Sequence, residues 1–211
     1  MILVTVCFAV ESRWIARRPA VRIIRTATGK RCCKTMDRLA SETSDVSLLL
    51  GSGFCGGIDP RLQTGDLFLA HTIRHRGEDV HIDSRLLDQA HHALDSGPAT
   101  LHVGLCESAD HVLQSGDKRA LAEAGVAAVD MESGPLARWA ADRGIPFLTL
   151  RGVLDSVEMD LPFRADRPFW ISALRHPFAS VRIARQAIGV GRALGTAVGT
   201  AIETFSRRPN V

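Results

Sequence analysis

Tyrosine is absent from the sequence, and aromatic residues make up only 5% of its 211 positions. A surface that stacks nucleic-acid bases needs several exposed rings, which this composition supplies poorly. The excess of positive charge is also small, because 26 Lys and Arg face 23 Asp and Glu and leave a net charge of +3. Neither feature indicates a nucleic-acid partner, and we expect none.

Disulfide and zinc frameworks are also poorly supported. The five cysteines form no C-x-x-C motif, and Cys32 and Cys33 are adjacent, which favours a reducing, cytoplasmic setting. The apolar start MILVTVCFAV is too short to span a bilayer and lacks the basic region of a signal peptide. His71 and His75 have a spacing of four, but no cysteine lies close to them in sequence, and we expect no metal.

The remaining pattern predicts one α/β domain over residues 1–211. Hydrophobic residues make up 45% of the chain, and continuous apolar runs alternate with helical patterns. We expect three αβα layers with a central mixed β-sheet. The expected strands are Ile2–Ala9, Val21–Thr26, Val46–Leu50, Asp66–Ala70, Thr100–Cys106, Gly125–Met131 and Pro146–Leu154, and the expected helices are Arg13–Arg18, Asp83–Leu94, Lys118–Ala124, Glu132–Arg143 and Phe178–Phe205.

The last of these helices is strongly amphipathic. Arg182, Arg185 and Arg192 share a polar arc, opposite apolar residues that face a core. A solvated helix face accounts for this stripe, and contact with anionic lipid is the alternative.

Acidic residues follow three of the predicted strands. Glu11 follows the first, Asp130 and Glu132 flank Met131 after the strand ending near Val129, and Asp155 follows the last. Ligands of α/β folds collect at the carboxyl ends of strands, so these carboxylates form a candidate site. The alternative is that each one only caps a helix.

A glycine-rich segment, Gly51-Ser52-Gly53-Phe54-Cys55-Gly56-Gly57, follows the strand Val46–Leu50. Such a segment lets backbone N–H groups approach a ligand, although a plain glycine-rich turn explains it equally well. It lacks the lysine of a P-loop.

Four stretches together resemble the nucleoside phosphorylase and nucleosidase superfamily. They are the strand that leads to Glu11, GSGFCGGIDPRLQTGDLFLA at 51–70, GLCESADHVL at 104–113 and VDMESGPLARWAADRGIPFLTLRGVLDS at 129–156. The resemblance implies a nucleoside phosphorylase-like fold and cleavage of the N-glycosidic bond of a purine nucleoside.

The resemblance also implies roles for individual residues. Asp155 matches the general acid that protonates N7 of the leaving base, and Glu11 matches the carboxylate that activates the attacking water. Glu132 matches the carboxylate that binds the ribose hydroxyls, and Met131 the apolar wall beside them. The implied substrate-binding set is Glu132, Met131, Asp130, Ser52, Gly53, Phe54, Gly56 and Val112.

Departures from the family pattern concern the substrate. Phe54 replaces a small polar residue, Val112 replaces a stacking Phe, and Leu154 replaces the Ser before the acid. The opening VCFAVESR and the segment VLDSVEMDLP at 153–162 resemble the hopanoid-associated branch, which implies adenosylhopane as substrate. Apolar residues that could hold its triterpene, or instead form core or interface, are Phe54, Leu161, Pro162, Phe163, Phe169 and Trp170.

We therefore expect an enzyme that releases adenine from adenosylhopane without an organic cofactor or metal. The nucleophile stays open between water and phosphate, for which Arg13, Arg17 and Arg151 are candidates by position. The resemblance suggests a homodimer, and a lipid-linked substrate suggests peripheral membrane contact. A methylthioadenosine, adenosylhomocysteine or futalosine nucleosidase and a non-catalytic nucleoside- or lipid-binding protein are the alternatives.

Overall fold

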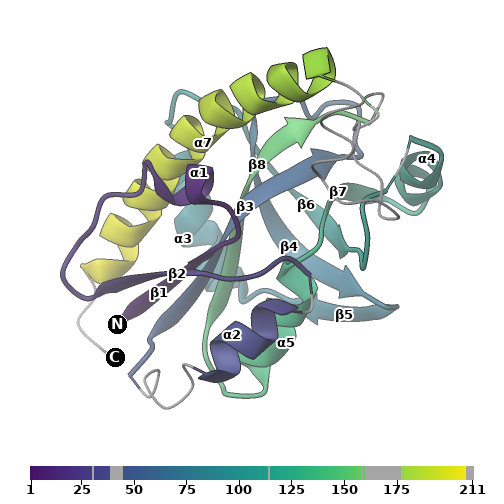
Figure 1. The fold of residues 1–211 in the computed structure, drawn as a ribbon. Coiled ribbons are helices and arrows are strands. Elements are labelled where there is room, and N and C mark those ends of the chain that lie inside the picture. Colours follow the sequence, from purple (N-terminus) through teal and green to yellow (C-terminus); the bar gives the residue numbers. More distant parts are fainter. Residues whose placement is uncertain (30, 39–44, 114, 158, 160–176, 208–211) are drawn as a thin grey trace.

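The computed structural model describes residues 1–29, 31–38, 45–113, 115–157, 159 and 177–207. Its strands form one mixed sheet, with α1, α3 and α7 packed together on one side and α2 beside α5 on another (Figure 1). The predicted α/β class with a mixed central sheet is therefore confirmed.

The strands are β1 Ile2–Val6, β2 Val21–Arg25, β3 Leu48–Gly57, β4 Leu67–His75, β5 Glu78–His81, β6 Leu101–Ser108, β7 Val126–Asp130 and β8 Phe147–Asp155. The helices are α1 Ala9–Ser12, α2 Arg31–Arg38, α3 Ser84–Leu94, α4 Ser115–Glu123, α5 Ser133–Ala141 and α7 Pro177–Ser206.

Five of the strands close into a ring. The sheet follows the order β2-β1-β3-β7-β6-β4-β5, and β8 pairs in parallel with β3 and antiparallel with β4. The path β3–β8–β4–β6–β7 therefore returns to β3. Burial on both faces explains why β1 and β8 read as nearly continuous apolar runs.

The glycine-rich segment is part of a strand, which corrects the predicted end of the strand at Leu50 and excludes the alternative of a plain turn. β3 continues to Gly57 and stays paired with β8 from Leu49 opposite Phe147 to Cys55 opposite Val153. A Cβ at Gly53 would lie 2.5 Å from Nη1 of Arg151, so glycine here leaves space for a buried side chain of the neighbouring strand.

The first predicted helix, Arg13–Arg18, is wrong. The helix lies earlier, at Ala9–Ser12, because the Glu11 carboxylate accepts hydrogen bonds from the backbone N–H groups of Cys7 and Phe8 and starts the turn there. α2 and β5 were not predicted from the sequence. β5 pairs with β4 through a tight turn at Arg76 and Gly77, which have φ values of 53° and 79°.

The long C-terminal helix is confirmed, since α7 spans Pro177–Ser206. Two of its glycines allow α1 and the following Trp14 to pack closely against α7. A Cβ at Gly195 would overlap Trp14, and a Cβ at Gly191 would lie 3.1 Å from the Val10 carbonyl oxygen. The helix that carries Glu11 is therefore held against α7. Among the described helices, none is both long and apolar enough to cross a membrane.

Candidate active site

Two of the predicted acidic residues, Glu11 and Asp155, lie against residues 53–56 of β3. The Oε1 atom of Glu11 accepts a hydrogen bond from the Phe54 backbone at 3.2 Å. Asp155, the last residue of β8, lies opposite Gly56 in the ladder. The end of β7 reaches the same place, because Val129 also pairs with Gly56. Residues far apart in the sequence thus surround one short stretch of backbone.

Glu11 is only 1% exposed and lies on the inner side of α1. Its Oε2 atom accepts hydrogen bonds from the backbone N–H groups of Cys7 at 2.7 Å and Phe8 at 2.8 Å. Burial raises the pKa of Glu11, although these hydrogen bonds and Arg151 oppose the shift. A carboxyl group with a raised pKa is a stronger base once ionised, which suits the activation of water.

Arg151 is a buried cation in the middle of β8, with 1% exposure. Its Nη2 atom lies 2.7 Å from Oδ2 of Asp130 and donates to Ser133 Oγ at 2.8 Å, while Nε donates to Thr149 Oγ1 at 3.1 Å. The Nη1 atom lies 3.9 Å from Oε2 of Glu132. A sequence signal for this network exists, because Arg151 is the one charged residue in an otherwise mostly apolar run, but the partners were not predicted.

Glu132 lies at the N-cap of α5 but makes no side-chain capping hydrogen bond. Its Oε1 atom instead accepts a hydrogen bond from the Gly29 backbone at 3.0 Å, and Met131 lies against the same glycine. Burial raises the pKa of Glu132, with Arg151 opposing the shift. Asp130 does serve the helix start, because its carboxylate accepts from Ser133 N at 3.1 Å. The capping alternative therefore describes Asp130 better than Glu132.

Asp155 is 2% exposed, and its Oδ2 atom binds the ammonium group of Lys118. Lys118 is equally buried and also donates to the carbonyl oxygens of Ser156 at 3.2 Å and Met159 at 3.5 Å. Burial raises the pKa of Asp155, while Lys118 lowers it and does not fully cancel the shift. Lys118 was not predicted as a site residue, although its position on the same helix face as Leu121 was a usable signal.

The other predicted residues lie on or near the same strand. A Cβ at Gly56 would lie 3.2 Å from Asp155 Oδ2, so this glycine leaves room for the carboxylate. The Ser52 hydroxyl is buried without a hydrogen-bond partner among the described residues. Phe54 is half-buried against the core, and Val112 is half-buried between β6 and α4. The structure thus groups most of the predicted set, while the role of each residue stays a prediction.

The histidines of β4 and β5 are held by hydrogen bonds of their own. Ring nitrogens of His71 and His81 lie 2.8 Å and 3.1 Å from the Thr72 hydroxyl. Within the part of the chain that the structure describes, no group of three or more His, Cys, Asp or Glu side chains is arranged to hold a metal ion.

Comparison with known proteins gives relatives along most of the chain. A 5′-methylthioadenosine/S-adenosylhomocysteine nucleosidase of Exiguobacterium sp. is 24% identical over 161 residues, which cover 65% of this chain and 68% of that relative. A Borrelia burgdorferi B31 protein assigned to the same activity and bound to adenine has a TM-score of 0.78 at 15% identity, with 96% of this chain and 99% of that chain covered. Futalosine hydrolase of Helicobacter pylori has a TM-score of 0.75 at 14% identity, with 96% and 97% covered.

These structural likenesses establish the fold. The family itself follows from a sequence model described as the phosphorylase superfamily, which matches residues 16–169. That stretch contains β3, β7 and β8, and with them the carboxylates Glu132 and Asp155. The predicted resemblance is confirmed, and the chain belongs to the phosphorylase superfamily.

Proposed function

We propose that the protein releases adenine from adenosylhopane, a step of hopanoid biosynthesis, by cleaving the N-glycosidic bond between the purine and the ribose. Its family and its nucleosidase relative make it an enzyme of the N-glycosyl-cleaving class. The observation that carries the proposal is the burial of Glu11 and Asp155 at one stretch of β3, with the buried Glu132 near Arg151 of the neighbouring strand.

Each carboxylate has a task in this reaction. As the bond between C1′ and the purine lengthens, the ribose gains positive charge, which the Glu132 carboxylate stabilises. Asp155 transfers its proton to N7, so that adenine leaves as a neutral molecule. A water oxygen bonds to C1′, and Glu11 accepts the proton that this water loses. The raised pKa of Asp155 supports a proton donor near neutral pH.

Water is the nucleophile that the charges favour. Arg151 and Lys118 are the two buried cations of the described residues, and both already face carboxylates. A phosphate dianion would have to approach Glu11 and Glu132 without an uncommitted cation from this set. Water meets no such repulsion and can donate a hydrogen bond to Glu11.

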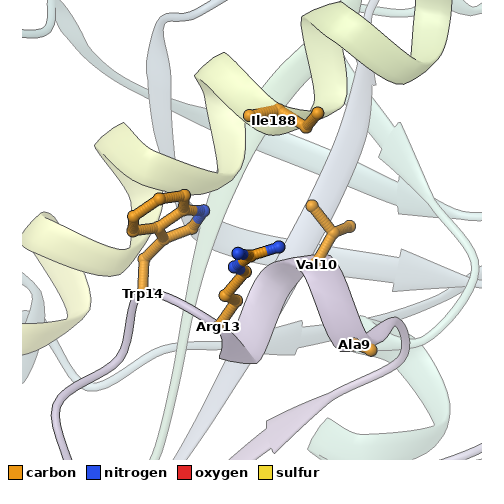
Figure 2. A pocket seen from close by; sticks show the side chains of 5 residues that line it. All are labelled: Ala9, Val10, Arg13, Trp14 and Ile188. Atoms are coloured by element: carbon orange, nitrogen blue, oxygen red, sulfur yellow. The ribbon is translucent and has the colours of Figure 1, made fainter.

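An apolar 5′ substituent is supported by the surface beside Glu11. Phe8, the N-cap residue of α1, lies three positions before Glu11 and is 52% exposed. A pocket of about 410 Å³ lies between the α1 region and α7. Figure 2 shows the side chains that line it, which are Ala9, Val10, Arg13, Trp14 and Ile188. The apolar residues predicted after the acid, Leu161, Pro162, Phe163, Phe169 and Trp170, lie outside the described residues.

Membrane contact and dimerisation belong to the same proposal. Arg182, Arg185 and Arg192 are exposed on α7, near the exposed Ile188, and would suit an anionic lipid surface that presents the substrate. A homodimer remains the assembly that the family resemblance implies. Light scattering and flotation with phosphatidylglycerol vesicles measure these two properties separately.

The experiment is adenine release from adenosylhopane in detergent, methylthioadenosine and adenosine, each with and without phosphate. We expect adenine from adenosylhopane, with free ribose rather than ribose 1-phosphate at the cleaved carbon. Release mainly from methylthioadenosine would favour the second candidate, the activity that names the Exiguobacterium relative. Phosphate-dependent release would overturn the choice of water.

Asp155→Asn separates an enzyme from a binding protein. The variant keeps a hydrogen bond to the base but cannot supply the proton, so turnover should fall about 100-fold or more. Binding of adenine, measured by calorimetry, should change little. Equal loss of binding and turnover would argue against the role of Asp155 as the acid.

A further inference from the structure

Lys118 is a buried cation that the proposed reaction does not yet use. It is the one described residue of α4 that is fully buried, and its side chain reaches from that helix to the end of β8. Its ammonium group contacts one carboxylate oxygen and two backbone carbonyl oxygens. An ammonium group has three N–H donors, and this set of partners matches them.

The contact is one-sided with respect to the Asp155 carboxylate. Lys118 binds Oδ2, whereas both carboxylate oxygens lie close to β3, since a Cβ at Gly56 would lie 3.2 Å from Oδ2 and 3.4 Å from Oδ1. The described contact between the two side chains involves Oδ2 and not Oδ1. Because Oδ2 is occupied by a donor, a proton carried by Asp155 resides on Oδ1.

We propose that Lys118 is a positioning residue for proton donation: it fixes which oxygen of Asp155 carries the proton and balances the carboxylate that remains after transfer. This inference rests on the proposed function and deepens it. Proton transfer breaks the bond between Oδ1 and its hydrogen and forms one to N7 of the leaving base, which leaves Asp155 with a negative charge. That charge arises at a site with 2% exposure, where a neighbouring cation is needed to stabilise it.

The groups around Asp155 identify Lys118 as its counter-charge. From β3, Cys55 faces this region, and burial raises its pKa, so it stays a neutral thiol. Asp130 on β7 and Arg151 on β8 also lie near Cys55, but they form an ion pair with each other at 2.7 Å. Lys118 on α4 alone makes a direct ionic contact with Asp155 among the described residues.

The two carbonyl contacts extend this role to the chain after the acid. Ser156 follows Asp155 directly and Met159 comes three positions later, and Lys118 binds the backbone carbonyl oxygens of both. One side chain therefore holds the proposed acid and the segment that leads away from it in a common arrangement. A neutral side chain of the same length would fill the space but would hold neither.

The test compares Lys118→Met, Lys118→Arg and a control, Arg119→Met, at an exposed neighbouring position of α4. Without the ammonium group Asp155 is a weaker acid, so kcat of Lys118→Met should fall about 10- to 100-fold. The alkaline limb of the kcat profile should move to higher pH by about one unit or more. Lys118→Arg should keep the limb near that of the wild type, and Arg119→Met should match the wild type throughout.

A second readout works without turnover. The ¹³C signal of the Asp155 carboxyl group, identified by its loss in Asp155→Asn, should titrate at higher pH in Lys118→Met than in the wild type. An unchanged titration midpoint and an unchanged alkaline limb in a folded Lys118→Met protein would overturn the inference. If the wild type releases no adenine from any nucleoside, the proposed function fails, while the titration still decides whether Lys118 controls the charge of Asp155.

Discussion

The site contains two buried cations that are held in different ways. Arg151 projects from the middle of β8 and binds two hydroxyls and the carboxylates of Asp130 and Glu132. Lys118 projects from a mostly exposed helix and binds a single carboxylate, that of Asp155. Both side chains are at most 2% exposed, so burial does not distinguish them.

The two cations therefore suit different roles, because Arg151 faces carboxylates that keep their charge in the proposed reaction, while Lys118 faces one whose charge changes. A guanidinium group stays protonated and matches its partners in one planar geometry, so Arg151 suits a permanent framework on the ribose side. An ammonium group is a compact charge, and Lys118 faces the carboxyl group that is proposed to lose and regain a proton. Substitutions at the two cations should therefore have different consequences.

The largest effect is expected from Arg151→Met. Removal of the guanidinium leaves Asp130 buried without its ionic partner, which costs about 3–5 kcal/mol of unfolding free energy. Urea denaturation measures this loss. Arg151→Lys keeps the charge but not the planar fork and should recover only part of the stability, whereas a loss below about 1 kcal/mol in Arg151→Met would contradict a framework role.

Glu11→Gln tests the nucleophile on the Arg151 side. The amide oxygen can still accept hydrogen bonds from the backbone, but it cannot take a proton, so kcat should fall about 100-fold. Because burial raises the pKa of Glu11, the wild type should lose activity as pH falls through that raised value. The variant should lack this acid limb, and an unchanged limb would assign it to another group.

Lys118→Met should destabilise the protein in a pH-dependent manner. Removing the ammonium raises the pKa of Asp155 further above its unfolded value, and stability from a raised pKa is present at low pH and lost as pH rises through the folded value. The cost should be about 1–3 kcal/mol at alkaline pH and smaller at acidic pH. A cost independent of pH would indicate lost packing alone.

The last pair of substitutions concerns two glycines of β3, one beside Arg151 and the other beside Asp155, the partner of Lys118. A methyl group at Gly53 would meet Arg151 Nη1 at 2.5 Å, and Gly53→Ala should cost about 1–3 kcal/mol. A methyl group at Gly56 would meet Asp155 Oδ2 and Val129 at 3.2 Å, so Gly56→Ala should cost less than about 1 kcal/mol. Thermal unfolding measures which variant loses more stability. A larger loss in Gly56→Ala than in Gly53→Ala would show that the Arg151 side chain shifts away from a methyl group more easily than Asp155 does.

Helical periodicity and apolar runs were enough to predict β1, β8 and α7. Each of these elements packs on the core along its length, so its apolar residues form an unbroken pattern in the sequence. The second half of β3 was missed because glycines carry no side chain from which a strand pattern can be read. α1 was missed because a helix of four residues is too short to show a helical periodicity. Backbone hydrogen bonds to the Glu11 carboxylate and packing on α7 hold this helix in place.

The candidate site divides in the same way. The acidic residues were predicted because each follows an apolar run, and strand ends converge in α/β folds. The partners of Asp155 and Asp130 could not be read from the sequence alone. Lys118 precedes Asp155 by 37 positions, and only the tertiary fold brings the two charges together.

The closed ring also has a consequence for association between chains. Strands β3, β4, β6, β7 and β8 have partners on both sides, so the open edges of the described sheet are β2 and β5. The β2 edge carries Arg22 and Arg25, and the short β5 edge carries Glu78 and Asp79. Charged and short edge strands discourage pairing with a strand of another molecule. The fold thus limits its own tendency to aggregate at the two places where a further strand could be added.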